Sequence, residues 1–177
     1  SRLIENVLDF SRIQRGRKQY RFRLGDVNAC IRQAVTMMQP CARQAGFEIA
    51  ADLAEVPSFS FDPDAVVQIV VNLLDNAIKY ARQAADRTLH VRSRYEGPWV
   101  TIEIEDHGPG IPRRQRGRVF DAFYRVGDEA CRETTGTGLG LALVKRFAQA
   151  HGGSVQILAA RPRGAVLRVR LAARQPA

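Results

Sequence analysis

Three short stretches of the chain carry residue types and spacings suited to binding a nucleotide. They are NLLDNAIKY at Asn72–Tyr80, DHGPG at Asp106–Gly110 and GTGLGL at Gly136–Leu141. The first places two amides and a lysine on one predicted helix. The other two are glycine-built turns, one beside a carboxylate and one before a helix start. Together they predict a pocket that holds a purine at one end and phosphates at the other.

The first stretch lies on a helix predicted from about residue 63 to residue 84, and this helix is apolar over most of its circumference. Its polar residues lie three, four or seven positions apart and so form one stripe. Unpaired polar groups on a buried helix cost about 1–3 kcal/mol each, so the stripe faces either water or a polar ligand. If it faces a ligand, an amide oxygen suits magnesium, and a lysine suits the phosphates that the metal bridges. The stripe consists of Gln68, Asn72, Asp75, Asn76 and Lys79.

The second stretch follows the alternating apolar segment VTIEI, which places Asp106 at the end of a strand. Gly108 and Gly110 flank a proline and allow a tight turn with a close backbone approach. A buried carboxylate at this point would accept the exocyclic amino group of adenine, which guanine does not offer. The alternative is an ordinary turn with a solvated aspartate.

The third stretch precedes a helix predicted to begin near Leu139. Backbone N–H groups at a helix start bind phosphate, and glycines allow the phosphate to approach. No strand precedes the stretch, so it is not a dinucleotide fingerprint, and no GxxxxGK[ST] phosphate loop occurs in the chain. A hinge is the alternative interpretation of these glycines.

The remaining pattern alternates helices with short strands. Helical periodicity occurs over 1–14, from 26 or 28 to about 44, and over 139–150. No regular element is predicted over 108–135, a stretch rich in glycine, proline and charge, and such a stretch is typical of a functional lid or of disorder. Strands or extended pieces are predicted at 20–24, 47–53, 58–64, 88–96, 99–106, 154–160 and 165–172.

The three motifs occur in one order, with the aromatic cluster FDAFYR at Phe120–Arg125 between the second and the third. In this order they resemble the N box, first glycine box, F box and second glycine box of sensor histidine kinases. The resemblance is to the ATP-binding catalytic domain of a two-component kinase, within the gyrase, Hsp90, histidine kinase and MutL superfamily. It covers about residue 20 to the C-terminus. LIENVLDFSRI at Leu3–Ile13 is similar to the end of the second dimerisation-domain helix of such kinases.

The resemblance implies an α/β fold: a two-layer sandwich of a mixed β-sheet and α-helices (Bergerat-type ATP-binding fold) with a flexible ATP lid. We therefore expect residues 1–14 to be a remnant of the dimerisation helix and residues 15–177 to be the ATP-binding catalytic domain. The lid is expected at about 108–135. The implied cofactors are ATP and Mg²⁺.

The resemblance also assigns roles to individual residues. Asn76 would coordinate Mg²⁺, and Asn72 would lie beside the metal and the phosphates. Tyr80 would border the nucleotide, and Asp106 would accept the adenine amino group. The implied catalytic residues are Asn72, Lys79 and Arg125. Gly108 and Gly110 would shape the adenine floor. The triphosphate site would be formed by Gly136, Thr137, Gly138, Leu139 and Gly140.

The implied reaction is transfer of the ATP γ-phosphoryl group to a histidine on a dimerisation domain absent here, for relay to a response regulator. Asn72 stands where the gyrase and Hsp90 branches carry a glutamate base. An amide cannot take a proton from water, so phosphotransfer is favoured over hydrolysis. His90, His107 and His151 lie outside the phosphoacceptor motif, so we expect no autophosphorylation. An anti-sigma-type serine kinase and a non-catalytic nucleotide-binding scaffold are the alternatives.

Composition limits the remaining function classes. The formal net charge is +9 over 177 residues, but the basic residues are spread along the whole chain. We expect no nucleic-acid partner, because a clustered basic patch with interleaved aromatic residues is missing. No apolar run approaches the ~20 residues that span a bilayer. We expect a cytoplasmic location, with membrane attachment only through parts of the parent protein absent here. The expected partners are the phosphoacceptor domain of the same kinase and a response regulator.

Overall fold

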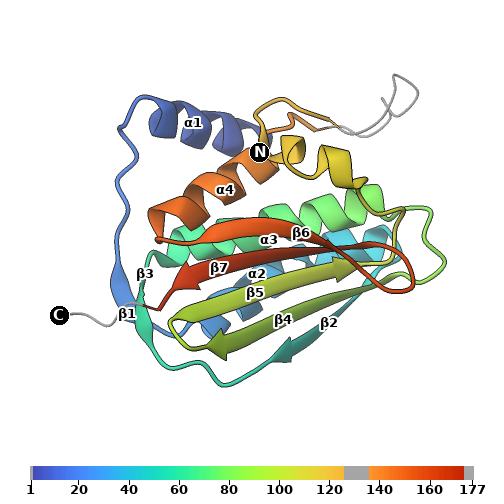
Figure 1. Ribbon diagram of the computed structural model, residues 1–177, viewed down its shortest axis with the longest axis horizontal. Coiled ribbons are helices and arrows are strands. Elements are labelled where there is room, and N and C mark those ends of the chain that lie inside the picture. Colours follow the sequence, from blue (N-terminus) through green and yellow to red (C-terminus); the bar gives the residue numbers. More distant parts are fainter. Residues whose placement is uncertain (1, 126–135, 174–177) are drawn as a thin grey trace.

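The computed structural model of the chain describes residues 2–125 and 136–173. Its main sheet has five strands in the order β2-β4-β5-β7-β6, and helices cover one of its faces (Figure 1). β2 runs parallel to β4, whereas the other neighbouring strands are antiparallel. The predicted two-layer α/β class is therefore confirmed. The strands are β1 Arg23–Gly25, β2 Glu48–Leu53, β3 Phe59–Phe61, β4 Thr88–Glu96, β5 Trp99–Asp106, β6 Ser154–Ala159 and β7 Ala165–Ala172.

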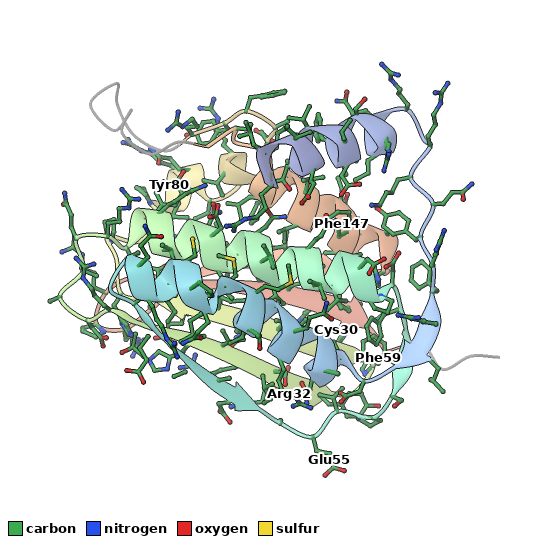
Figure 2. The ribbon with its side chains drawn as sticks, turned by 180° about the vertical axis from the view of Figure 1, so that it is seen from behind. Cys30, Arg32, Glu55, Phe59, Tyr80 and Phe147 are labelled. Atoms are coloured by element: carbon green, nitrogen blue, oxygen red, sulfur yellow. The ribbon has the colours of Figure 1, made fainter. Side chains whose placement is uncertain are left out.

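The helices begin where the sequence supplies caps. The Asp26 carboxylate accepts a hydrogen bond from a backbone N–H in the first turn of α2, and Asp62 does the same for α3. Pro63 occupies the first position of α3, where its missing N–H costs nothing. Figure 2, which views the molecule from the helix side, shows these two helices side by side in front of the sheet. The helices are α1 Arg2–Gln14, α2 Val27–Gln44, α3 Pro63–Tyr80 and α4 Gly140–Ala150, with short 3-10 helices η1 Arg113–Gln115 and η2 Arg118–Phe120.

The core lies between the helices and the inner face of the sheet. Strand side chains alternate between two faces, so apolar rows point inward and charged rows point outward. On the outer face Arg92 contacts Glu105 at 2.5 Å, and Arg168 contacts Glu103 at 2.5 Å. These cross-strand ion pairs allow the outer face to remain uncovered. One inner row, with exposures of 3% or less, consists of Val91, Ile104 and Leu167.

The strand predicted at 20–24 is mostly wrong, because only Arg23–Gly25 pairs with β3. The Tyr20 and Phe22 rings instead pack in an aromatic cluster beside the end of α4. Phe22 lies 4.8 Å from the His151 ring, and Tyr20 lies 6.3 Å from the Phe147 ring, measured between centroids. The contacts of these two rings with Phe147 and His151 hold residues 20–22 beside α4, outside the two-stranded ladder.

The helix predicted to about residue 84 ends at Tyr80. Arg87 donates hydrogen bonds to the carbonyls of Ala45 and Arg82, and these bonds draw the chain back toward the end of α2. The stretch predicted to lack regular structure contains η1 and η2, with Val119 and Phe120 buried in the core. Residues 126–135 of that stretch lie outside the described residues.

Candidate functional site

The N box forms the second half of α3. Asn72 is 6% exposed, and Asn76 follows one turn later and is half-buried. The Asn76 amide has no hydrogen-bond partner among the described residues, so its oxygen is available to a ligand. Asn72 is different, because its Oδ1 accepts a hydrogen bond from Asn6 Nδ2 of α1 at 3.3 Å.

Both glycine boxes meet this helix. A Cβ at Gly140 would lie 3.3 Å from Asn72 Oδ1, and a Cβ at Gly136 would lie 3.6 Å from Lys79 Nζ. At the other end, a Cβ at Gly108 would lie 3.0 Å from the Ala81 Cα, immediately after α3. α3 therefore brings together three motifs that are far apart in the sequence, as the nucleotide hypothesis requires.

The second glycine box is joined to the F box. The Phe123 backbone N–H donates to the Gly138 carbonyl at 3.0 Å, and a Cβ at Gly138 would lie 2.9 Å from the Phe123 Cα. Gly138 has φ +70°, in the left-handed region that favours glycine. Leu139 is 1% exposed and anchors the box in the interior, whereas Gly136 is exposed and Thr137 is half-buried.

α4 begins without a side-chain cap. Leu139 occupies its N-cap position and makes no capping hydrogen bond, and its first turn contains no acidic residue. α2 and α3 are both capped by aspartates. The first N–H groups of α4, beside Gly140, therefore suit an anionic ligand such as phosphate.

Asp106 is 5% exposed at the end of β5, and its Oδ1 accepts the Gly108 backbone N–H at 2.9 Å. Burial raises the pKa of this carboxyl, and hydrogen bonds from the Gly108 and Ala165 backbone N–H groups partly oppose the shift. The group is therefore buried, as the adenine hypothesis requires, and the alternative of a solvated turn aspartate is wrong. Gly110 and Gly164 pack against each other beneath it, and a Cβ at Gly164 would lie 1.9 Å from the Asp106 carbonyl oxygen.

Asp75 holds two cations on the polar stripe of α3. Its Oδ2 accepts from Lys79 Nζ at 2.6 Å, and its Oδ1 lies 3.3 Å from an Arg2 nitrogen of α1. The Lys79 ammonium is thus positioned by its neighbour one turn earlier. Sequence analysis placed Asp75 on the stripe but gave it no role in the site.

α1 covers the phosphate end of the site. Besides the bonds from Asn6 and Arg2, the Phe10 ring packs edge-on against Phe123 of the F box, with centroids 6.0 Å apart. Its apolar stripe points away from the domain, with exposures of 45–59% for Leu3, Ile4, Val7 and Leu8.

The other predicted residues lie at the rim. Tyr80 is 43% exposed at the end of α3 (Figure 2), and Arg125 is exposed at the edge of the described segment. No cluster of three histidine, cysteine or acidic side chains in the described part of the chain could hold a metal. A magnesium ion would therefore rely on the Asn76 amide and on phosphate oxygens.

Comparison with known proteins places this geometry in a family. A profile of the histidine kinase-, DNA gyrase B- and HSP90-like ATPase family matches residues 61–175. The chain belongs to this ATPase family. Its matched region contains the N box and both glycine boxes, the motifs that converge on α3.

The similar proteins are sensor kinases. The chain is 33% identical over 158 residues to the circadian input-output histidine kinase CikA of Synechococcus elongatus, covering 88% of this chain and 21% of CikA. It is 33% identical over 156 residues to the alginate biosynthesis sensor protein KinB of Pseudomonas aeruginosa, covering 88% of this chain and 25% of KinB. The chain thus spans about a quarter of the length of these curated relatives.

Solved structures give the same result. Full-length ShkA in complex with AMPPNP superposes with a TM-score of 0.82 at 28% identity, covering 99% of this chain and 36% of ShkA. The mycobacterial sensor histidine kinase MprB superposes with a TM-score of 0.70 at 26% identity, covering 89% of this chain and 100% of that chain. The chain is an ATP-binding catalytic domain of the sensor histidine kinase type within this ATPase family.

Proposed function

We propose that this domain binds Mg-ATP between α3 and the two glycine boxes and donates the γ-phosphoryl group to a histidine of a dimerisation domain. Relay to an aspartate of a response regulator would follow. The observation that supports this most strongly is the convergence of the three motifs on α3, where Asn72 meets Gly140 and Lys79 meets Gly136.

Each side chain has a distinct task in this proposal. The buried Asp106 carboxyl accepts the adenine amino group, and the uncapped start of α4 holds phosphate. Asn76 coordinates Mg²⁺, and Asn72 lies beside the metal and the phosphates. The Lys79 ammonium contacts phosphate beside Gly136. The metal neutralises charge on the phosphates when bound. Because Asn72 is an amide, it cannot take a proton from water, which favours transfer over hydrolysis.

The partner proposals rest on α1. Four large apolar side chains of this helix are 45–59% exposed, while Asn6 and Arg2 contact α3. We infer that this stripe belongs to a dimerisation helix whose bundle partners cover it, and that Arg125 reaches phosphate or that helix. We also propose that residues 108–135 close over ATP as a lid.

Among the described residues, no helix is long and apolar enough to cross a bilayer. We propose that the parent sensor holds this domain in the cytoplasm, where ATP and a response regulator are available.

Calorimetric titration of ATP, with Mg²⁺ and then with EDTA, tests the proposal. The wild-type domain is expected to bind ATP at least about tenfold more tightly with the metal. Asn76→Ala is expected to remove this metal effect while leaving the adenine contact at Asp106. Gln68→Ala, on the same stripe but two turns earlier, is the matched control and is expected to keep it.

Two other outcomes separate the alternatives. A scaffold would show neither ATP binding nor a metal effect. An anti-sigma-type kinase would transfer phosphate to serine, and this product survives acid treatment, whereas phosphohistidine does not. Either result would contradict the proposed function.

A further inference from the structure

A groove of about 410 Å³ lies outside the nucleotide site, between α4 and the edge strand β6. Figure 1 shows α4 and β6 running next to each other at this side of the sheet. Lys145 and Gln149 of α4 line one wall, and Val155 and Ile157 of β6 line the other. Arg116, just after η1, also lines the groove, which contains no residue of the N box or of either glycine box.

The β6 wall has unpaired backbone groups. Among the described strands β6 pairs with β7 alone, so its other side is a sheet edge. The Ala160 N–H donates to the Gly164 carbonyl at 3.1 Å, which makes these two residues a hydrogen-bonded pair. Bonded and non-bonded pairs alternate along an antiparallel ladder. Val155 and Ile157 therefore direct their backbone N–H and C=O groups outward, along the groove.

The groove is basic. Arg116 and Lys145 are half-buried, and neither has an ion-pair partner in the described part of the chain. Arg116 Nε donates to the Ile111 carbonyl at 2.9 Å, which holds the guanidinium in place and leaves its terminal N–H groups available. Arg92 and Arg168, which are half-buried on the open sheet face, by contrast contact carboxylates. Two cations without anions at one groove indicate an anionic ligand.

Apolar side chains complete the lining. Phe120 of η2 is 8% exposed, Ile157 is 7% exposed, and Val155 is half-buried. An extended peptide presents alternate side chains to opposite sides, so it can direct apolar residues to this lining while acidic residues reach the cations.

We propose that this groove binds an extended acidic segment of a partner protein, which adds a strand to the free edge of β6. Main-chain hydrogen bonds from Val155 and Ile157 provide the pairing, and Arg116 and Lys145 select negative charge. Addition of a strand to an exposed sheet edge beside a helix is a general mode of peptide recognition. The site shares Phe120 with the F box but includes no residue of the N box or of either glycine box, and it needs neither ATP nor Mg²⁺.

A capped ten-residue peptide of alternating glutamate and valine is the probe, and the corresponding lysine–valine peptide is its control. Amide NMR of the labelled domain is expected to show shifts and slowed hydrogen exchange at Val155 and Ile157 with the acidic peptide alone. The affinity is expected to fall as salt rises from 50 to 300 mM, because the contacts are partly exposed.

Variants test the two components separately. Lys145→Glu and Arg116→Glu are each expected to weaken binding about fivefold, whereas Arg43→Glu on the exposed side of α2 is expected to have no effect. Val155→Pro removes one outward N–H, which an edge position tolerates, and is expected to abolish binding. Val155→Ala retains that N–H and is expected to bind, with melting temperatures confirming that both variants fold.

Three results would overturn the proposal. Equal affinities for the acidic and the basic peptide would show that Arg116 and Lys145 do not select a negatively charged ligand. Exchange protection confined to other strands would place the peptide elsewhere. Concentration-dependent protection of Val155 and Ile157 without peptide would show that the edge pairs with a second copy of the chain instead.

Discussion

The Asp106 carboxyl is 5% exposed, and its environment favours ligand recognition over stability. Burial raises its pKa, so the folded state holds the proton more tightly than the unfolded chain does. Its stabilising contribution is fully present below the unfolded pKa of about 3.9 and is lost as pH rises through the higher folded value. At neutral pH the ionised group therefore costs folding free energy.

We predict that Asp106→Asn stabilises the ligand-free domain at pH 7 and weakens ATP binding. A neutral amide avoids the desolvated charge, so urea denaturation is expected to show a gain of about 0.5–2 kcal/mol. Loss of the charged acceptor for the adenine amino group is expected to lower ATP affinity about tenfold or more. The stability gain is expected to decrease as pH falls, because protonation removes the desolvated charge from the wild-type carboxyl.

Asp86→Asn is the matched control. Asp86 is fully exposed, and hydrogen bonds from Thr88 lower its pKa, so the ionised form favours the fold. This variant is expected to lose stability at pH 7 and to bind ATP as the wild type does. If both variants changed stability and ATP affinity in the same direction, the result would contradict the role assigned to Asp106.

His151 is a second buried titratable group, and its role is structural. Its Nε2 accepts the Asp62 backbone N–H at 3.0 Å, and its Nδ1 lies 2.7 Å from the Phe147 carbonyl. The ring thus ties the end of α4 to the cap of α3. Burial lowers its pKa, so the folded state favours the neutral ring. Stability is expected to be full above the unfolded pKa of about 6.5 and to decrease as pH falls toward the folded value.

We predict that His151→Gln removes this acid sensitivity. The amide oxygen of glutamine can still accept the Asp62 N–H but binds no proton near pH 6. Stability at pH 7.5 is expected to fall by about 1–2 kcal/mol, since the Phe147 contact is lost. Urea denaturation between pH 5 and 7.5 is expected to give a flatter profile than the wild type. His90→Gln, at a half-exposed site, is expected to retain the wild-type slope.

At the scale of elements, α1 covers the side of α3 where we propose that the nucleotide binds. The Asn6 amide donates to Asn72 Oδ1, and Arg2 contacts Asp75, which also holds Lys79. We predict that Asn6→Ala strengthens Mg-ATP binding about threefold to fivefold, because a neutral hydrogen bond is worth about 1 kcal/mol net. Titration calorimetry against Glu5→Ala, an exposed change on the same helix, measures the effect. Identical affinities for the two variants would exclude competition at Asn72.

Element boundaries show what the sequence could predict. The pattern predicted the end of α2 near Gln44 and left its cap open between Asp26 and Asn28, of which Asp26 is the cap. It predicted the start of α3 correctly, since Asp62 and Pro63 act locally. The end of α3 and the pairing of β1 could not be predicted. Arg87 and the aromatic cluster around His151 determine them, and both make contacts with distant parts of the chain.

The site shows the same division between local and distant information. The glycine boxes could be placed from the sequence, because their residue types reflect a local backbone requirement such as φ +70° at Gly138. The Asn6–Asn72 hydrogen bond joins residues 66 positions apart, and no local sequence pattern predicts it. The role of Gly164 could not be predicted either. The sequence around it indicates only a turn between two strands, whereas its lack of a Cβ allows the close contact with the Asp106 carbonyl oxygen.

At the scale of the whole molecule, the surfaces have separate chemistry. On the helix side, the nucleotide motifs lie around α3. The open sheet face carries cross-strand ion pairs. The groove beside β6 combines outward backbone groups with Arg116 and Lys145, which have no ion-pair partner in the described part of the chain. We infer that a nucleotide and an acidic partner segment can bind at the same time, because the groove contains no residue of the N box or of either glycine box.

The three histidines bear on what the isolated domain can phosphorylate. His151 is buried with both ring nitrogens in hydrogen bonds, and His107 lies 3.6 Å from the Asp86 carboxylate. His90 stacks edge-on against His107, with centroids 5.5 Å apart. None of these three rings lies on a helix packed beside the phosphate end of the site, where an in-line acceptor would have to approach.

We therefore predict that the domain does not phosphorylate itself. Incubation with γ-labelled ATP and Mg²⁺ is expected to leave the chain unlabelled, because no acceptor imidazole reaches the γ-phosphate. Addition of a separately folded dimerisation domain from a similar sensor kinase is expected to give acid-labile label on the added domain. Asn76→Ala is expected to abolish this transfer. Acid-labile label on the domain itself would show that one of its own histidines reaches the phosphate, and that the acceptor need not come from a separate helix.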